Sequence, residues 1–208
     1  MKMHIKKLDD NILYYTDLFS DPKGFIDKIE SLDISNNNTT QISKWKTWTA
    51  SDDDIIYGLS KDGMFSNMQY QTEDDLDTSL LVYKIKAISD LCFANYAHHT
   101  GCPNLKLPNY FSIRKYNSLA DMGQHVDAED PTDKAHPVVS GVLYLNDDYE
   151  GGEIYFPEQN IKIKPESGSI ILFPSYRPYF HHPLPVTSGT KYMIPFFWFD
   201  LETNWGVI

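Results

Sequence analysis

Hydrophobic residues change their spacing near the middle of the chain, from a helical period before residue 109 to a strand period after it. A short apolar piece at Ile12–Tyr15 predicts a first strand. A short helix is expected next, because Ser20-Asp21-Pro22 provides an N-cap followed by an early proline. Apolar residues then recur at helical spacing, at Phe25, Ile26, Ile29 and Leu32.

A second, longer helix is predicted between Thr72, which can cap its start, and Gly101, a typical stop signal. His98 and His99 lie in its last turn, where polar side chains meet free carbonyl groups, so we expect capping rather than metal binding. One face is apolar, with Leu81, Ile85, Ile88 and Cys92. The stretch from Lys44 to Gln71 lacks a clear period and is predicted to be irregular with one strand.

Alternating apolar and polar residues with polar turns between them predict a run of short strands from residue 109 onward. These strands are expected at Tyr110–Tyr116, Gly123–Ala128, Pro137–Leu145, Glu153–Phe156, Asn160–Ile163, Ser169–Phe173, Tyr179–His182 and Lys191–Phe199. About eight short strands after a helical start are typical of a jelly roll, or double-stranded β-helix. We therefore predict an all-β core with flanking helices, an α+β arrangement with the helices packed on one sheet of the barrel.

A single domain spanning 1–208 is expected, because no linker rich in proline, glycine or serine divides the chain. Within it, 1–108 would form a helical and irregular support region and 109–200 the jelly-roll core.

The acidic composition limits the partners of the protein. A net charge of -11 and a pI of about 4.9 disfavour nucleic acid and anionic membrane as partners, since both need a basic surface. No apolar run is long enough for a membrane span, and the first residues lack a signal-peptide core, so we expect a soluble, cytoplasmic protein. Cys92 and Cys102 are expected to be reduced thiols.

His125-Val126-Asp127 is the first candidate for chemistry. Side chains two apart on a strand project to the same side, so His125 and Asp127 would face one pocket. One later histidine, from the pair His181-His182, would complete a two-histidine, one-carboxylate set. Such a set leaves coordination positions open and suits Fe(II) oxygen chemistry. By itself the short motif is equally met by a surface histidine beside a solvated aspartate.

Five ordered blocks give this motif a context. They are Gln124–Asp127, Ser140–Asn146 (SGVLYLN), Gly151–Pro157 (GGEIYFP), Gly168–Ser175 (GSIILFPS) and Pro185–Tyr192 (PVTSGTKY). Together they resemble the Fe(II)/2-oxoglutarate dioxygenases of the prolyl 4-hydroxylase type over roughly the last 100 residues. That family has a jelly-roll fold with flanking helices, in agreement with the strand pattern.

The resemblance implies Fe(II) as metal, with 2-oxoglutarate and O2 as cosubstrates and ascorbate as a stimulant. It implies a hydroxylation of a C–H bond coupled to decarboxylation of 2-oxoglutarate to succinate, on a peptidyl, prolyl or small-molecule substrate. Lys191 stands at the basic position of the family that pairs with the distal carboxylate of 2-oxoglutarate. Tyr144 stands at its tyrosine position, and Tyr116 matches a second active-site tyrosine of animal relatives.

Some residues depart from the pattern of the family. Pro195 stands where some relatives carry a hydroxyl residue, four places after the basic one. Phe197, followed by Trp198, stands where several prolyl hydroxylases place a tryptophan beside the substrate, so both are candidate substrate contacts. His136 and Arg177, in loops flanking the expected site, are two further candidates, although ordinary loop residues would look the same.

Two arguments give different answers for which histidine is the third ligand, His181 or His182. Strand parity favours His182, which shares a face with the apolar Phe180 and Leu184. Spacing favours His181, which stands ten residues before Lys191, as in bacterial and plant relatives. Prolines interrupt a regular strand here, so we predict His181 as ligand and His182 as a rim residue.

Two other functions fit part of the pattern. A hydrolase could use Zn²⁺ in the same two-histidine, one-aspartate set to activate water. A jelly roll can also serve as a binding module without catalysis, because fold alone does not fix function. Neither requires a buried cation at Lys191 or a tyrosine at Tyr144.

Overall fold

The major sheet is the centre of the fold in this computed structural model, which describes residues 3–31, 46–48, 65–70, 76–103, 105–107, 111–117, 122–130 and 136–200. Within that part of the chain its strand order is β1-β2-β11-β7-β14-β6-β4-β3, with β5 paired to β14. All these pairings are antiparallel. The strands are β1 His4–Asp9, β2 Ile12–Thr16, β3 Lys46–Trp48, β4 Phe65–Tyr70, β5 Leu105–Lys106, β6 Phe111–Tyr116, β7 Val139–Tyr144, β11 Ser169–Pro174 and β14 Lys191–Asp200.

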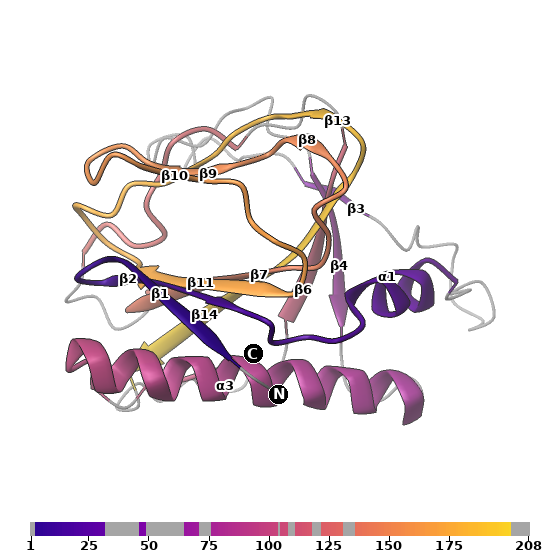
Figure 1. Ribbon diagram of the computed structural model, residues 1–208, viewed down its shortest axis with the longest axis horizontal. Coiled ribbons are helices and arrows are strands. Elements are labelled where there is room, and N and C mark those ends of the chain that lie inside the picture. Colours follow the sequence, from indigo (N-terminus) through magenta and orange to yellow (C-terminus); the bar gives the residue numbers. More distant parts are fainter. Residues whose placement is uncertain are drawn as a thin grey trace.

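Short strands form a second layer over one face of the major sheet (Figure 1). One small sheet has the order β10-β9-β12 and the other pairs β13 with β8. The strands are β8 Glu150–Gly151, β9 Ile154–Phe156, β10 Ile161–Ile163, β12 His182–Pro183 and β13 Val186–Ser188. The opposite face of the major sheet carries the long helix α3, Leu76–Thr100, which crosses it in Figure 1.

Strand β14 shows how the sheet separates two environments. Because side chains alternate along a strand, every second residue faces the helix layer and the others face the short strands. The first set, Tyr192, Ile194, Phe196 and Trp198, belongs to the apolar core beneath the sheet. The second set, Lys191, Met193, Pro195 and Phe197, lines the pocket between the two layers.

Both helices bury apolar faces, as predicted. In α1, Pro22–Ser31, Phe25 and Ile29 are buried. In α3, Ile85, Ile88 and Cys92 are buried, and the helix ends before Gly101, whose φ of 72° is a conformation that glycine adopts readily. Neither described helix combines the length and apolarity needed to span a bilayer.

The N-terminal region contributes more strand than predicted. The first strand expected at Ile12–Tyr15 is β2, but it is preceded by β1 and pairs directly with β11 in the major sheet. Between Lys44 and Gln71, where one strand was predicted, the structure has β3 and β4. The predicted cap at Thr72 and the apolar Leu32 lie outside the described residues.

Two predicted strands are largely irregular in the structure. Gly123–Ala128 forms only an isolated bridge at His125, and Tyr179–His182 keeps strand geometry only from His182 onward. Prolines near the second segment remove donors that a regular ladder would need, which is why strand parity fails there. The remaining strands predicted after residue 109 are present at closely similar bounds.

Trp198 is predicted to be a stability residue, because it is 1% exposed and stacks on Phe93 of α3 with ring centroids 5.1 Å apart. Trp198→Ala should lower the free energy of unfolding by about 3–5 kcal/mol, the usual cost of removing a buried large aromatic ring. Urea unfolding would measure this loss from the midpoint and slope. Phe197→Ala, at the half-buried neighbour on the opposite face, is the control and should cost clearly less. Equal costs would contradict the assigned faces.

Candidate functional site

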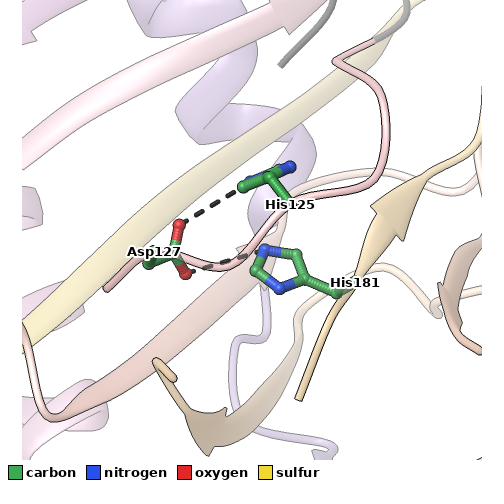
Figure 2. Close-up of side chains that lie close together, drawn as sticks. All are labelled: His125, Asp127 and His181. Carbon is green, nitrogen blue, oxygen red and sulfur yellow. Dashed lines mark ion pairs between the residues drawn. The ribbon is translucent and has the colours of Figure 1, made fainter. Parts of the chain in front are cut away.

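Two buried histidines and one half-buried aspartate meet in the pocket between the two layers (Figure 2). His125 Nε2 lies 3.7 Å from Asp127 Oδ1, and His181 Nε2 lies 3.6 Å from Asp127 Oδ2. One ligand atom of each residue lies within 4.8 Å of the others. The structure therefore brings together the three residues predicted from the sequence as metal ligands.

Main-chain hydrogen bonds position these ligands in place of a regular strand. His125 and His181 exchange two bonds, with the His125 amide donating at 3.0 Å and the His181 amide donating at 2.9 Å. The amides of Asp127 and Ala128 both donate to the carbonyl of Ser175 at 2.9 Å. His125 and Asp127 thus face the same pocket, as predicted, although the segment that carries them is not a strand.

The histidine rings are oriented with Nε2 toward the pocket. His125 Nδ1 lies 3.1 Å from the Gly123 carbonyl and His181 Nδ1 lies 3.4 Å from the Tyr179 carbonyl. A carbonyl only accepts, so Nδ1 carries the proton and Nε2 keeps its lone pair. Burial lowers the pKa of both histidines below the usual value, which favours neutral rings. Neutral imidazoles beside a carboxylate fit a divalent transition metal.

The carboxylate of Asp127 is held by a pair of buried serines. Ser140 Oγ donates to Asp127 Oδ2 at 2.6 Å, and Ser175 Oγ lies 2.7 Å from Ser140 Oγ. Sequence reasoning missed the role of both, because a serine within or just after a strand carries no pattern that distinguishes it from other small core residues. Only the pairing of neighbouring strands brings them to the ligand.

Lys191 lies in the same pocket and is 2% exposed. Its Nζ donates to the Gly152 carbonyl at 2.7 Å, and the rings of Tyr144, Tyr116 and Tyr149 surround it at 5.1, 5.7 and 5.8 Å. Within the described part of the chain no carboxylate forms an ion pair with it. Burial lowers the pKa of Lys191 to about 7. A buried ammonium without a counterion fits an anionic ligand.

Two residues that sequence reasoning did not select, Arg114 and Met122, also line the pocket. Tyr116 Oη donates to Met122 Sδ at 3.0 Å, and Arg114 Nη1 lies 3.7 Å from the same sulfur. The positive charge of Arg114 adds to burial in lowering the pKa of both histidines. Because Arg114 and Tyr116 are two apart on β6, counting from the tyrosine would have placed the arginine on the pocket face.

Of the residues expected near the substrate, some line the pocket in the structure and others do not. Pro195 and Phe197 line the pocket. Trp198, also predicted as a substrate contact, lies instead in the helix-facing core, because it is the next residue on the same strand. His182 is half-buried on β12 and is not part of the ligand cluster.

The two loop candidates lie outside the ligand cluster. Arg177 makes a bidentate ion pair with Glu129 at 3.0 and 3.1 Å and stacks over Phe180. His136 is half-buried at the end of the loop before β7. Arg177 therefore links the segment after Asp127 to the segment before His181.

The fold and the site together combine a jelly roll with a pocket that holds two histidines, one carboxylate and a buried lysine, a donor set that fits a facial-triad metal site. Residues 111–200 match the family described as the 2OG-Fe(II) oxygenase superfamily. The part of the chain from β6 to β14 is therefore similar to the 2OG-Fe(II) oxygenases, and to prolyl 4-hydroxylases among them.

Known relatives agree with this placement. A candidate prolyl 4-hydroxylase of Acanthamoeba polyphaga mimivirus is 31% identical over 95 residues, which are 42% of this chain and 39% of that protein. The chain spans about two fifths or less of the length of the curated relatives it matches.

Solved structures with low sequence identity show the same fold. The viral collagen prolyl hydroxylase of Paramecium bursaria Chlorella virus-1, in complex with 2OG, is 19% identical with a TM-score of 0.56. The alignment covers 77% of this chain and 97% of that one. A Trichoplax adhaerens prolyl hydroxylase bound to a hypoxia inducible factor peptide fragment is 15% identical with a TM-score of 0.68, over 92% and 84%. The predicted double-stranded β-helix fold with flanking helices is confirmed.

His181 and His182 are predicted to differ sharply in metal binding. His181→Ala removes a buried ligand, so affinity for Fe(II) should fall by more than the roughly 10–100-fold that loss of a residue supporting a ligand costs. His182→Ala should leave the affinity nearly unchanged, because its side chain is outside the cluster. Anaerobic Fe(II) titration of both variants would measure this. Loss of binding in the His182 variant alone would contradict the assignment.

Proposed function

We propose that the protein is an Fe(II)- and 2-oxoglutarate-dependent dioxygenase that hydroxylates a C–H bond of a peptidyl (including prolyl) or small-molecule substrate. The observation that carries this proposal is one pocket that holds both the His125, Asp127 and His181 set and the buried ammonium of Lys191. The first set fits the metal and the second fits the distal carboxylate of 2-oxoglutarate.

Each group has a task in this proposal. His125, Asp127 and His181 would hold Fe(II), which with 2-oxoglutarate and O2 supplies the oxidising power for hydroxylation, releasing succinate and CO2. Lys191 would neutralise the distal carboxylate, and the Tyr144 and Tyr116 hydroxyls would complete its surroundings. Burial raises the pKa of both tyrosines, so they remain neutral hydrogen-bond donors at physiological pH.

Lys191 also separates this function from the two alternatives. A zinc hydrolase needs only its ligands, a water and the substrate, and a binding module needs no metal set. Neither gives a reason to bury an ammonium with no counterion in the described residues, which costs free energy. A dianionic cosubstrate gives such a reason.

A prolyl peptide is the first substrate to test. One structural neighbour is a collagen prolyl hydroxylase, and another is a prolyl hydroxylase in complex with a hypoxia inducible factor peptide fragment. Phe197 rather than tryptophan in the pocket argues for including free amino acids beside peptides.

The decisive experiment is succinate formation from 2-oxoglutarate with added Fe(II), first without a prime substrate and then with proline peptides and free amino acids. Uncoupled turnover that requires Fe(II), and increases with one substrate class, is expected. Zn²⁺ in place of Fe(II) is the control and should give no succinate. Absence of both turnover and Fe(II)-dependent 2-oxoglutarate binding would exclude the proposal.

Lys191→Ala is predicted to weaken binding of 2-oxoglutarate, because it leaves the distal carboxylate buried without a partner. The cost of such a loss is about 3–5 kcal/mol. The apparent constant for 2-oxoglutarate should rise by about two to three orders of magnitude, since about 1.4 kcal/mol is tenfold. Lys162→Ala, at an exposed lysine on β10, is the control and should change nothing. An unchanged constant in the Lys191 variant would assign the carboxylate to another cation.

Binding of 2-oxoglutarate is also predicted to take up a proton. The pKa of Lys191 is about 7 in the folded protein, and a carboxylate beside the amine raises it again. At pH 8 the free site is mostly neutral and the complex is charged, so about one proton should be bound per 2-oxoglutarate. Calorimetry in buffers of different ionisation enthalpy would measure this uptake, and affinity should fall as pH rises above about 7. Uptake near zero at pH 8 would contradict the lowered pKa.

The stability of the ligand-free protein should rise with pH over the range in which the affinity for 2-oxoglutarate falls. The pKa of Lys191 is below its ordinary value of 10.5, so the unfolded chain binds more protons between pH 7 and 10.5. Burial of the charged Lys191 therefore lowers the free energy of unfolding below pH 7. This loss is recovered as the pH rises from 7 to 10.5.

A further inference from the structure

A chain of two buried hydroxyls ends on one oxygen of the Asp127 carboxylate. Ser140 is 1% exposed and Ser175 is fully buried. Ser140 donates its only proton to Asp127 Oδ2, so Ser175 is the donor in the 2.7 Å contact between the two hydroxyls. Within the described residues no hydrogen bond reaches the other oxygen, Oδ1. The two oxygens of one carboxylate are therefore in different environments.

The main chain of Ser175 also fixes the main chain of Asp127. The Ser175 carbonyl accepts the amides of Asp127 and Ala128, and the Ser175 amide donates to Val138 at 3.1 Å. Ser140 lies on β7, which pairs with β11 in the middle of the major sheet. The carboxylate is thus held from a rigid part of the fold, while the segment that carries it has no strand geometry.

We propose that Ser140, supported by Ser175, is a positioning residue that restricts Asp127 to a single metal-binding oxygen, Oδ1. A charge-assisted hydrogen bond to Oδ2 competes with a second bond from the carboxylate to the metal. In this role both serines act through the Asp127 carboxylate.

This restriction determines how many positions of the metal remain open. The inference rests on the proposed function, in which 2-oxoglutarate fills two positions and O2 fills one. An octahedral metal with two histidines and one carboxylate oxygen keeps three positions free. A carboxylate that binds through both oxygens would leave two, and 2-oxoglutarate would then occupy both. The Ser140 hydroxyl would therefore preserve the position for O2.

The test counts the water molecules on Mn²⁺ bound to the protein without 2-oxoglutarate, by water-proton relaxation. Wild type should hold about three and Ser140→Ala about two, because bidentate binding displaces one. Ser140→Thr keeps the hydroxyl and should restore the wild-type value. Ser169→Ala is the control: this serine is equally buried on neighbouring β11, but its hydroxyl donates to the Glu166 carbonyl, away from the site.

The outcomes separate this inference from the proposed function. Wild type that binds no Mn²⁺ at the site would overturn the proposed function. Wild type with about three waters and Ser140→Ala with the same number would overturn only the role of Ser140, as would loss of Mn²⁺ binding by a folded Ser140→Ala. If that variant does not fold, Ser175→Ala replaces it, with a smaller decrease expected, and an unchanged number would again overturn the proposal.

Discussion

The two hydrogen bonds exchanged between the main chains of His125 and His181 are the constraint on which the site depends. They join a segment that follows β6 to a segment that follows β11, far apart in sequence. Without them each histidine would be carried by an irregular loop. With them, both rings and the Asp127 carboxylate converge on one point. This side of the pocket is therefore held in place without long, regular strands.

The major sheet supplies the rigidity that this small bridge lacks. On its helix-facing side, Trp198 and Phe93 stack within a large apolar core. Its other side carries charged and polar groups among apolar residues: Lys191, Arg114, Ser140 and the tyrosines Tyr14, Tyr116 and Tyr144. Burial of apolar residues on the helix-facing side stabilises the fold. This stabilisation offsets the free energy that burying charged groups on the pocket side costs.

Most of the fold followed from the sequence because strand alternation and turn residues are local signals. On β14, counting by twos from Lys191 gives the pocket face correctly at Met193 and Phe197. The same count would have excluded Trp198, which was selected only because it follows Phe197 in the sequence. The ligand segments were mispredicted as strands because their geometry depends on one another, a property that neither segment shows alone.

Other parts of the site required the three-dimensional structure. Ser140 reaches Asp127 only because β7 lies beside the segment after β11, a consequence of strand order rather than of residue type. Similarly, β2 completes the sheet beside β11 although it comes from the opposite end of the chain. Long-range pairing of this kind leaves no local pattern to detect.

Gly152 shows how a turn can limit the variation of a distant pocket. Its φ is 66°, and a Cβ there would lie 2.7 Å from the ring of Tyr149, so a side chain at this position is disfavoured by both backbone and neighbours. Its carbonyl is also the hydrogen-bond acceptor of Lys191. A substitution that shifts this turn would move the lysine with it. The position of Lys191 in the interior therefore depends on a glycine in a surface turn. Few other residues should be found at position 152 in natural sequences.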